Sequence, residues 1–496
     1  MAWCCLGVKR MAELTIIRNG TAKTVAFDGE ERLSVLLQRA GEYMPHPCGG
    51  RGSCGKCAVT VTGAVSEPSD SERRAGVRLS CQITVKGDAS VTLPDNPHGE
   101  QIETETVGFS GTLSPMPGRY GAAVDIGTTT LAVKLFDLGS GNCIGTASGL
   151  NPQTAVAADV MGRIGAAMSG SLGLLRRQVT DGTERLLGEC RSQAGISAGP
   201  DSLVITGNTT MLYLLTGRDP ECLSHAPFEA DTLFGTDTTL FGRAYLPPCM
   251  NAFVGADITC AVLASGMCEK PGTALLCDIG TNGELALWRD GTLYVTSTAA
   301  GPAFEGAGIS CGSGSVSGAI DCVRVENGRL CSHTIGDAPA AGVCGSGLLD
   351  AVAAGLELEL IDETGAMDEE LVLARGVALQ PRDIRAVQLA KAAIAAGIQT
   401  LLETAEVSVK EIGRLYIAGG FGSHLRAESA AAIGLLPEEL TGRVCVLGNA
   451  ALAGAARVLL DVGAREMLER IAAASLHVNL GGNRRFNEHY IDQMLF

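Results

Sequence analysis

Three cysteines lie within ten residues near the start of the chain, in the stretch CGGRGSCGKC. Cys48, Cys54 and Cys57 are separated by five and then two residues, and both gaps contain glycine. The whole chain has 18 cysteines in 496 residues. In a reducing compartment such thiols are not expected to form disulfides, so each is either a small apolar core residue or a ligand. Cys277 and Cys445 lie singly in apolar runs and suit the core, whereas the glycine-rich loop suits ligation.

A fourth thiol, Cys81, follows this loop farther along the chain. The pattern C-x5-C-x2-C with one distant cysteine is typical of plant- or adrenodoxin-type [2Fe-2S] clusters. Zinc is the alternative, because C-x2-C also occurs in zinc ribbons, but those ribbons pair two such motifs. The glycines let backbone amides approach the sulfurs that they would stabilise. We therefore expect Cys48, Cys54, Cys57 and Cys81 to hold a one-electron carrier.

Two later stretches have residue types that suit phosphate. DIGTTT begins at Asp125 and DIGTNGE begins at Asp278, and each follows an apolar strand and leads into a second strand. Glycine allows a phosphate to come close, hydroxyl, amide and backbone N–H groups donate to its oxygens, and the aspartate positions magnesium, usually through water. One such turn is a weak signal because Asp-Gly turns are common. Two of them about 150 residues apart predict the two sides of one phosphate site.

The elements around the cysteines predict a small mixed sheet packed on one helix, over residues 11–94. Strands are expected at 14–20, 21–27, 58–65, 79–85 and 90–94, with Cys81 on a strand, and a helix at 33–41. Residues 95–118 are rich in Pro, Gly, Ser and Thr and are expected to form a linker. Residues 1–10 are expected to be either a dispensable extension or a mis-called start, because Met11 begins a coherent strand. Beyond the linker, long strands and alanine-rich helices predict an α/β part with a middle domain at 119–205 and a C-terminal domain at 206–496.

Composition excludes some partners and compartments. The chain has 38 basic and 54 acidic side chains, a net charge of -16, which argues against nucleic acid or an anionic membrane surface as the main partner. It contains no apolar stretch long enough for a membrane span, and its first residues have no apolar signal-peptide core. We therefore expect a cytoplasmic protein.

The order of motifs in the second part resembles the superfamily of acetate and sugar kinases, heat-shock chaperones and actin. After the first phosphate turn come GADITCAVLASGM from Gly255, the second turn, GRLYIAGGFGSHL with its glycine-rich turn, and LGNAALAGAAR from Leu447. Members of this superfamily close two lobes on ATP. The resemblance implies a two-lobed RNase H-like ATPase of the actin type. Together with the residues before it, the expected fold is a multidomain α/β chain with an N-terminal β-grasp ferredoxin-like domain, a linker and this ATPase.

A [2Fe-2S] domain in front of such an ATPase resembles the reductive activators of corrinoid-dependent methyltransferases, from Met11 to the C-terminus. Further support comes from NPQTAVAADVMGRI (151–164), TGNTTMLYLLTG (206–217), GVCGSGLLD (342–350), DIRAVQLAKAAIAAGI (383–398) and FNEHYIDQMLF (486–496). The chain departs from some relatives, which add [4Fe-4S] clusters at the C-terminus, because no cysteine follows Cys445. The N-terminal cluster is then the sole redox centre.

This resemblance implies a reaction and its partners. The reaction is the ATP-dependent one-electron reduction of an inactive Co(II) corrinoid protein to Co(I) for a methyltransferase system. A low-potential ferredoxin, flavodoxin or reductase would reload the cluster, and a homodimer is left open. Two alternatives remain at this point: an ATP-driven electron donor to another enzyme, such as the activators of radical dehydratases, and a nonredox chaperone or kinase with a structural metal.

The resemblance also implies roles for individual residues. Asp125 and Asp278 are expected on the magnesium side of ATP. The groups expected to contact phosphate or flank adenosine are Thr128, Thr129, Thr281 and Asn282 for phosphate, and Gly419, Gly420 and Gly422 for adenosine. Glu284 and Glu305 lie in polar stretches near the second turn and are candidates for positioning water. The alternative for both is a surface or hinge carboxylate.

Overall fold

Two compact units make up the chain. The computed structural model describes residues 11–18, 20–40, 42, 44, 52, 57–94, 111–113, 115–421 and 424–496. The first unit is Met1–Pro97 with Pro152–Arg163, and the second is His98–Asn151 with Ile164–Phe496. Cys48, Cys54, Gly422 and most of the expected linker lie outside the described residues.

The first unit has a mixed sheet packed on one helix. Its elements are β1 (Ala12–Arg18), β2 (Thr21–Phe27), β3 (Glu31–Arg32), α1 (Leu33–Arg39), β4 (Ala58–Val65), α2 (Asp70–Ala75), β5 (Arg78–Leu79) and β6 (Thr84–Thr92). The strand order is β2-β1-β6-β4-β5, with β3 on β6, and β1 runs parallel to β6. Leu33, Leu36 and Leu37 of α1 are at most 1% exposed and share a core with Leu14 and Ile16 of β1. This is the expected β-grasp ferredoxin-like architecture.

Cys81 does not lie on a strand, contrary to the prediction from its apolar surroundings. Strand β5 ends at Leu79 and β6 begins at Thr84, so Cys81 occupies the turn between them. The turn is closed by the N–H of Gln82, which donates to the carbonyl of Leu79 at 2.8 Å. In a turn, the direction of the Cys81 side chain is not restricted to one of the two faces of the sheet, as it would be in a strand.

The first sheet of the second unit consists of β7 (Tyr120–Ile126), β8 (Thr130–Asp137), β9 (Cys143–Leu150), β10 (Ser202–Gly207), β11 (Thr236–Thr238) and β12 (Ala244–Leu246). The strands lie in the order β11-β12-β10-β7-β8-β9. Strands β7, β8 and β9 form an antiparallel meander, and β10 pairs parallel to β7.

The second sheet consists of β13 (Thr273–Ile279), β14 (Gly283–Arg289), β15 (Thr292–Thr298), β21 (Ile412–Ala418), β22 (Val444–Gly448) and β23 (Ser475–His477). Its order, β22-β21-β13-β14-β15-β23, repeats the arrangement of the first sheet: a meander followed by two strands added parallel to its first strand. The internal repeat of the two phosphate turns is therefore a repeat of five strands of each sheet, as the two-lobed RNase H-like prediction requires. The sixth strand differs, because β11 pairs with β12 in the first sheet and β23 pairs with β15 in the second.

The boundary expected between residues 205 and 206 falls inside β10, whose bounds are Ser202–Gly207. Strand β10 pairs with β7 along its length, and β12 extends the same sheet to Leu246. A lobe boundary at that point would divide one hydrogen-bonded sheet, so the first lobe continues beyond it. The boundaries at 94 and 118 stay predictions.

The helices after β7 are α3 (Val160–Ala166), α4 (Leu172–Ala194), α5 (Thr209–Thr216), α6 (Ala256–Ser265), α7 (Gly345–Glu357), α8 (Pro381–Thr404), α9 (Ala427–Ala432), α10 (Ala450–Leu460), α11 (Ala464–Ala473) and α12 (Arg484–Asp492). The smaller sheets are β16 (Ala319–Glu326), β17 (Arg329–Thr334) and β18 (Gly342–Val343), and β19 (Leu371–Ala374) with β20 (Val377–Leu379). Among the helices in the described ranges, none is both long enough and apolar enough to span a bilayer.

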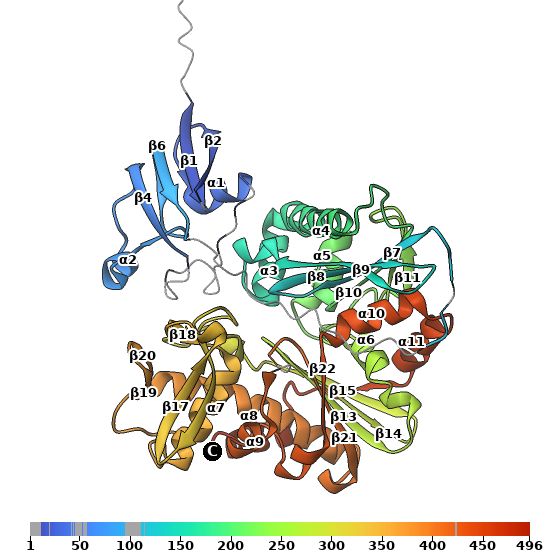
Figure 1. The fold of residues 1–496 in the computed structure, drawn as a ribbon. Coiled ribbons are helices and arrows are strands. Elements are labelled where there is room, and N and C mark those ends of the chain that lie inside the picture. Colours follow the sequence, from blue (N-terminus) through green and yellow to red (C-terminus); the bar gives the residue numbers. More distant parts are fainter. Residues whose placement is uncertain are drawn as a thin grey trace, which may run out of the picture. The chain divides into compact units, whose positions relative to one another are not determined.

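Helices α6 and α10 lie between the two sheets (Figure 1). Their buried residues share one core with Val204 of the first sheet and Leu276 of the second. Helix α4 covers the other face of the first sheet, and α8 packs on β14 and β15. The two small-residue stretches that contain Gly255 and Leu447 therefore form the layer that joins the lobes.

The contact between α6 and α10 depends on glycine. A Cβ atom at Gly454 would lie 2.0 Å from the carbonyl oxygen of Cys260, far closer than van der Waals contact. Because both helices are packed between sheets, neither can move away without disturbing the core.

We expect Gly454→Ala to destabilise the second unit by about 1–3 kcal/mol, because overpacking a buried contact exceeds the gain in helix propensity. The matched control is Gly165→Ala in α3, where an added Cβ meets nothing within 4 Å and should stabilise by about 0.5–1 kcal/mol. Urea unfolding followed by circular dichroism measures both. Equal stability of Gly454→Ala and the wild type would contradict this close packing.

Candidate functional site

The two phosphate turns are the ends of equivalent hairpins. Asp125 pairs with Ala132 across β7 and β8, and Asp278 pairs with Glu284 across β13 and β14. Burial raises the pKa of Asp278 to about 7, and the charge of Asp125 adds to this shift. Thr129 of the first turn and Thr281 of the second both contact Glu305 Oε2, so the two turns lie at one site.

Asp125 has a polar partner on the helix layer. Asn449 donates from Nδ2 to Asp125 Oδ2 at 2.9 Å. Burial raises the pKa of Asp125 to about 6, and the Asn449 amide opposes this shift because it stabilises the ionised form.

A third aspartate belongs to the site and was missed in the sequence. Asp257 lies in the first turn of α6, and burial raises its pKa to about 8, with further contributions from the charges of Asp278 and then Asp125. The available signal was one acid in an otherwise small and apolar helix, GADITCAVLASGM. Its closeness to the two turns is a tertiary property.

Glu284 is the fourth carboxylate. Burial raises its pKa well above the usual value, and the charges of Asp257 and Asp278 contribute. Ser297 donates to Glu284 Oε1 at 3.1 Å, which ties this side chain to the neighbouring strand β15. In the part of the chain that the structure describes, no three His, Cys, Asp or Glu side chains converge closely enough to ligate a metal ion directly.

Glu305 connects the two turns. Thr281 Oγ1 donates to Glu305 Oε2 at 2.9 Å, and Thr129 Oγ1 lies 3.5 Å from the same oxygen. Hydroxyls from both lobes therefore point at one carboxylate oxygen. Glu305 is exposed, so this oxygen marks an accessible position between the turns.

The other residues expected to contact phosphate are held within their turns. Thr128 Oγ1 accepts from Asn208 Nδ2 at 3.1 Å. The carbonyl of Asn282 accepts from the N–H of Gly280 at 3.0 Å and closes the second turn. Both turns are thus shaped by hydrogen bonds before any ligand binds.

The glycine-rich turn lies against the carboxylates. Gly419 has φ +90°, and an added Cβ would lie 2.7 Å from Asp278 Oδ1. Gly420 follows it in the described turn. Phe421 stacks on Phe304 with centroids 5.0 Å apart, and Phe304 directly precedes Glu305. This turn therefore contacts the acidic side of the site as well as the segment that carries Glu305.

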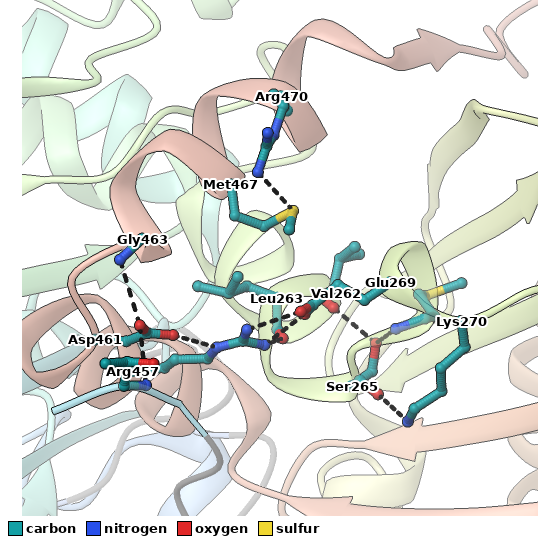
Figure 2. A network of polar contacts seen from close by, with 12 residues as sticks. Val262, Leu263, Ser265, Glu269, Lys270, Arg457, Asp461, Gly463, Met467 and Arg470 are labelled. Atoms are coloured by element: carbon teal, nitrogen blue, oxygen red, sulfur yellow. Dashed lines mark hydrogen bonds and ion pairs between the residues drawn. The ribbon is translucent and has the colours of Figure 1, made fainter.

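The far ends of α6 and α10 are joined by ion pairs and hydrogen bonds (Figure 2). Arg457 of α10 contacts both carboxylate oxygens of Glu269, at 2.6 and 3.0 Å, and donates to the carbonyl of Leu263 at 2.9 Å. Its Nε lies 3.4 Å from Asp461, which also accepts from the N–H of Thr112 at 3.3 Å. The helix layer is thus fixed at the end opposite to the carboxylates.

Two of the four expected cluster cysteines are described, and they lie together. Cys57 and Cys81 are 1% and 3% exposed, and Cys57 Sγ donates to Cys81 Sγ at 3.3 Å. This hydrogen bond lowers the pKa of Cys81 to about 6, and the side chain of Gln82 and the N–H of Gly52 contribute in the same direction. The same pairing and burial raise the pKa of Cys57.

These thiols fit the ligation of an iron-sulfur cluster. Their sulfurs are buried and lie 3.3 Å apart, which suits two ligands of one cluster. The N–H of Gly52 acts on a sulfur, which agrees with the role expected for the loop glycines. Cys48 and Cys54 lie outside the described residues, so their assignment stays a prediction.

Three family models match successive parts of the chain. A 2Fe-2S iron-sulfur cluster binding domain matches residues 16–86, the RACo middle region matches 120–270, and the C-terminal domain of RACo, the ASKHA domain, matches 272–496.

Curated relatives and a solved structure cover most of the chain. The corrinoid activation enzyme RamQ of Eubacterium limosum is 34% identical over 420 residues, which is 76% of this chain and 70% of that protein. The [Co(II) methylated amine-specific corrinoid protein] reductase of Methanosarcina barkeri is 24% identical over 421 residues, 76% of this chain and 77% of that protein. A structure titled reductive activator for corrinoid,iron-sulfur protein is 26% identical with a TM-score of 0.72 and covers 98% of both chains.

We expect Gly419→Ala to weaken ATP binding about tenfold or more, because the new methyl group would contact Asp278 and a positive φ strains an alanine. Gly413→Ala, on the same strand β21, is the control, since its Cβ would lie 3.6 Å from its nearest neighbour. Isothermal titration with ATP and magnesium measures both affinities. Unchanged affinity of Gly419→Ala would show that ATP does not depend on this turn.

Proposed function

Because the chain belongs to the family of reductive activators of corrinoid proteins, we propose that it performs the reaction implied by its sequence: ATP-dependent one-electron reduction of an inactive Co(II) corrinoid protein to Co(I) for a methyltransferase system. The observation that carries this proposal is that one chain combines two features. The first is a ferredoxin-type unit with a pair of buried thiols, and the second is a two-lobed site in which Thr129 and Thr281 both contact Glu305 Oε2. Both curated relatives name corrinoid activation or reduction, which favours this client over a radical dehydratase.

ATP has a thermodynamic reason to be present. Plant-type [2Fe-2S] clusters have reduction potentials of about -400 mV. The potential of the Co(II)/Co(I) couple of a corrinoid is well below this value. For a one-electron transfer, each 59 mV of unfavourable potential difference lowers the equilibrium constant about tenfold. Binding and hydrolysis of ATP would supply the missing free energy by driving lobe movement and release of the partner.

The carboxylates define the side of ATP that would face magnesium. Asp125 and Asp278 come from opposite turns, and Asp257 joins them from α6. Their mutual repulsion is relieved when a divalent cation lies among them. Among the described residues, no three carboxylates lie close enough together to ligate one ion directly. Water molecules would therefore complete the coordination shell of magnesium.

The hydroxyl groups define the phosphate side. Thr129 and Thr281 now contact Glu305, and a terminal phosphate between the lobes would take over these donors. Thr128 and Asn282 would contribute from the same turns. Glu305, displaced by the phosphate but still adjacent to it, would position the attacking water, with Glu284 as the more buried alternative. Gly419, Gly420 and Gly422 would border the adenosine.

The cluster would be held by Cys48, Cys54, Cys57 and Cys81. When bound, it supplies a one-electron redox couple. The protein's own contribution is to exclude water from Cys57 and Cys81 and to donate hydrogen bonds from Gly52 and Gln82 to the Cys81 sulfur. A low-potential ferredoxin, flavodoxin or reductase would deliver each electron.

We expect Cys57→Ala and Cys81→Ala each to abolish the visible absorption of the anaerobically purified protein, because each removes a thiolate ligand. Cys277→Ala and Cys445→Ala are matched controls from the second unit and should keep the spectrum and the iron content. Cys277 is buried as expected, whereas Cys445 is exposed and does not belong to the core. A colourless wild type that contains zinc would contradict the cluster, and a full cluster in Cys81→Ala would contradict this ligand.

A second test concerns the coupling of ATP to the electron. We expect Asp278→Asn to keep its cluster spectrum but to lose ATP hydrolysis and sustained formation of Co(I), with the affinity for Mg-ATP lowered about tenfold or more, because a metal-side charge is removed. The control is Asp290→Asn at the other end of the same hairpin, where the side chain is 88% exposed.

Anaerobic absorbance of the corrinoid partner, with reduced ferredoxin and with or without ATP, measures the outcome. If the wild type forms Co(I) equally well without ATP over many turnovers, ATP is not coupled to the electron. If Asp278→Asn matches the wild type, the coupling does not pass through this carboxylate.

A further inference from the structure

Three asparagine side chains converge on the first phosphate turn, each from a different segment. Asn449 Nδ2 donates to Asp125 Oδ2 at 2.9 Å, Asn208 Nδ2 donates to Thr128 Oγ1 at 3.1 Å, and Asn151 Nδ2 donates to the carbonyl of Gly127 at 2.8 Å. The turn from Asp125 to Thr128 therefore receives a carboxamide N–H at three of its four residues.

Two of these asparagines also begin helices. Asn449 is the N-cap of α10, and its Oδ1 accepts from the N–H of Leu452 at 2.8 Å. Asn208 is the N-cap of α5, and its Oδ1 accepts from the N–H of Met211 at 2.9 Å. Because a backbone N–H must meet the carbonyl oxygen, the cap fixes the orientation of the amide, and Nδ2 is directed to the turn.

The third asparagine is fixed by burial and by its backbone. Asn151 is 0% exposed, and its N–H donates to the carbonyl of Thr129 at 2.8 Å. Asn151 directly follows β9, whose last residue Leu150 pairs with Thr130. Asn151 therefore contacts the backbone of this segment at two points, the carbonyls of Gly127 and Thr129.

Only asparagine combines the two functions at positions 208 and 449. Aspartate and serine cap a helix about as well, but neither carries an amide donor. Aspartate at position 449 would also place a negative charge directly beside Asp125. Helix capping alone therefore does not explain why asparagine stands at these positions. The hydrogen bonds that the amide N–H groups donate to Asp125 and Thr128 do explain it.

We propose that Asn449 and Asn208, with Asn151, are positioning residues that set the first phosphate turn for ATP. Asn449 orients the Asp125 carboxylate, Asn208 orients the Thr128 hydroxyl, and Asn151 fixes the backbone between them. Asn449 is the N-cap of α10. Gly255 is the N-cap of α6, and a Cβ atom added to it would lie 2.4 Å from the Cα of Asn208. Asn449 and Asn208 therefore contact the helix layer between the lobes as well as the first phosphate turn. This inference rests on the proposed ATP site.

The test separates capping from positioning in the full-length, cluster-loaded protein. Asn449→Asp keeps the cap and removes the donor, and Asn208→Asp does the same for α5. Asn449→Ser keeps the cap but replaces the carboxamide, whose N–H contacts Asp125, with a shorter hydroxyl. Asn483→Asp is the matched control, because Asn483 caps α12 through its Oδ1 and the two N–H groups of Arg485 and Phe486. ATP affinity, KM and kcat for ATP hydrolysis, and Tm are measured for each variant.

We expect Asn449→Asp to weaken ATP binding about tenfold to hundredfold, the range for a lost hydrogen bond to a charged group, and Asn208→Asp about threefold to tenfold. Asn449→Ser should act in the same direction as Asn449→Asp but less strongly, because it adds no charge. In all three, KM should rise by more than kcat falls. Tm should stay within about 2 °C of the wild type in Asn449→Ser and Asn208→Asp because the caps remain, and it should fall in Asn449→Asp because the new charge lies beside Asp125. Asn483→Asp should change none of these quantities.

Variants of Asn449 that bind ATP as tightly as the wild type overturn the inference and leave the proposed function standing. So does a loss of ATP affinity in Asn449→Ser that only accompanies a large fall in Tm, because the role of Asn449 would then be structural. A wild type that binds no ATP overturns both.

Discussion

The burial of several carboxylates close to one another is the constraint on which the second unit depends. Asp125, Asp257 and Asp278 come from three segments, and each has its pKa raised by burial and, for the latter two, by the neighbouring charges. Folding brings them together at an energetic cost that a cation bound at the proposed site would offset. The neutral donors around them follow from this constraint, since an amide such as that of Asn449 steadies an acid without adding charge.

The helix layer between the sheets gives this site its mechanical connection. Helix α6 carries Asp257 and α10 begins at Asn449, so both helices start at the carboxylates. They touch at Gly454, where no side chain fits against Cys260, and are joined again by Arg457 at their far ends. In the proposed function, a rigid layer of this kind would convert a change at the phosphate turns into a movement of the lobes. Such a movement is the form in which ATP could influence a redox partner.

Several features of the site were beyond sequence reasoning for one reason, which is distance along the chain. Asn449 and Asp125 are separated by 324 residues, and nothing local in either motif indicates that they meet. Gly419 was expected beside adenosine, and only the fold shows that it also lies against Asp278. Cys81 was placed on a strand because its neighbours are apolar, whereas the hydrogen bonds of a turn determine its position. The boundary at 205 failed because the pairing of β10 with β7 is a long-range contact.

The sequence alone determined the properties that depend on residue type and local spacing. These are the cysteine pattern of the cluster, the paired phosphate turns, the alternating strands that build two similar sheets, and the order of motifs that identifies the family. The tertiary structure decided which of these residues act together: the membership of Asp257 in the site, the contact of Thr129 and Thr281 with one oxygen of Glu305, and the convergence of three carboxamides on one turn. Local spacing follows from covalent order and hydrogen-bond geometry, whereas convergence follows from the packing of sheets and helices, which a single sequence does not display.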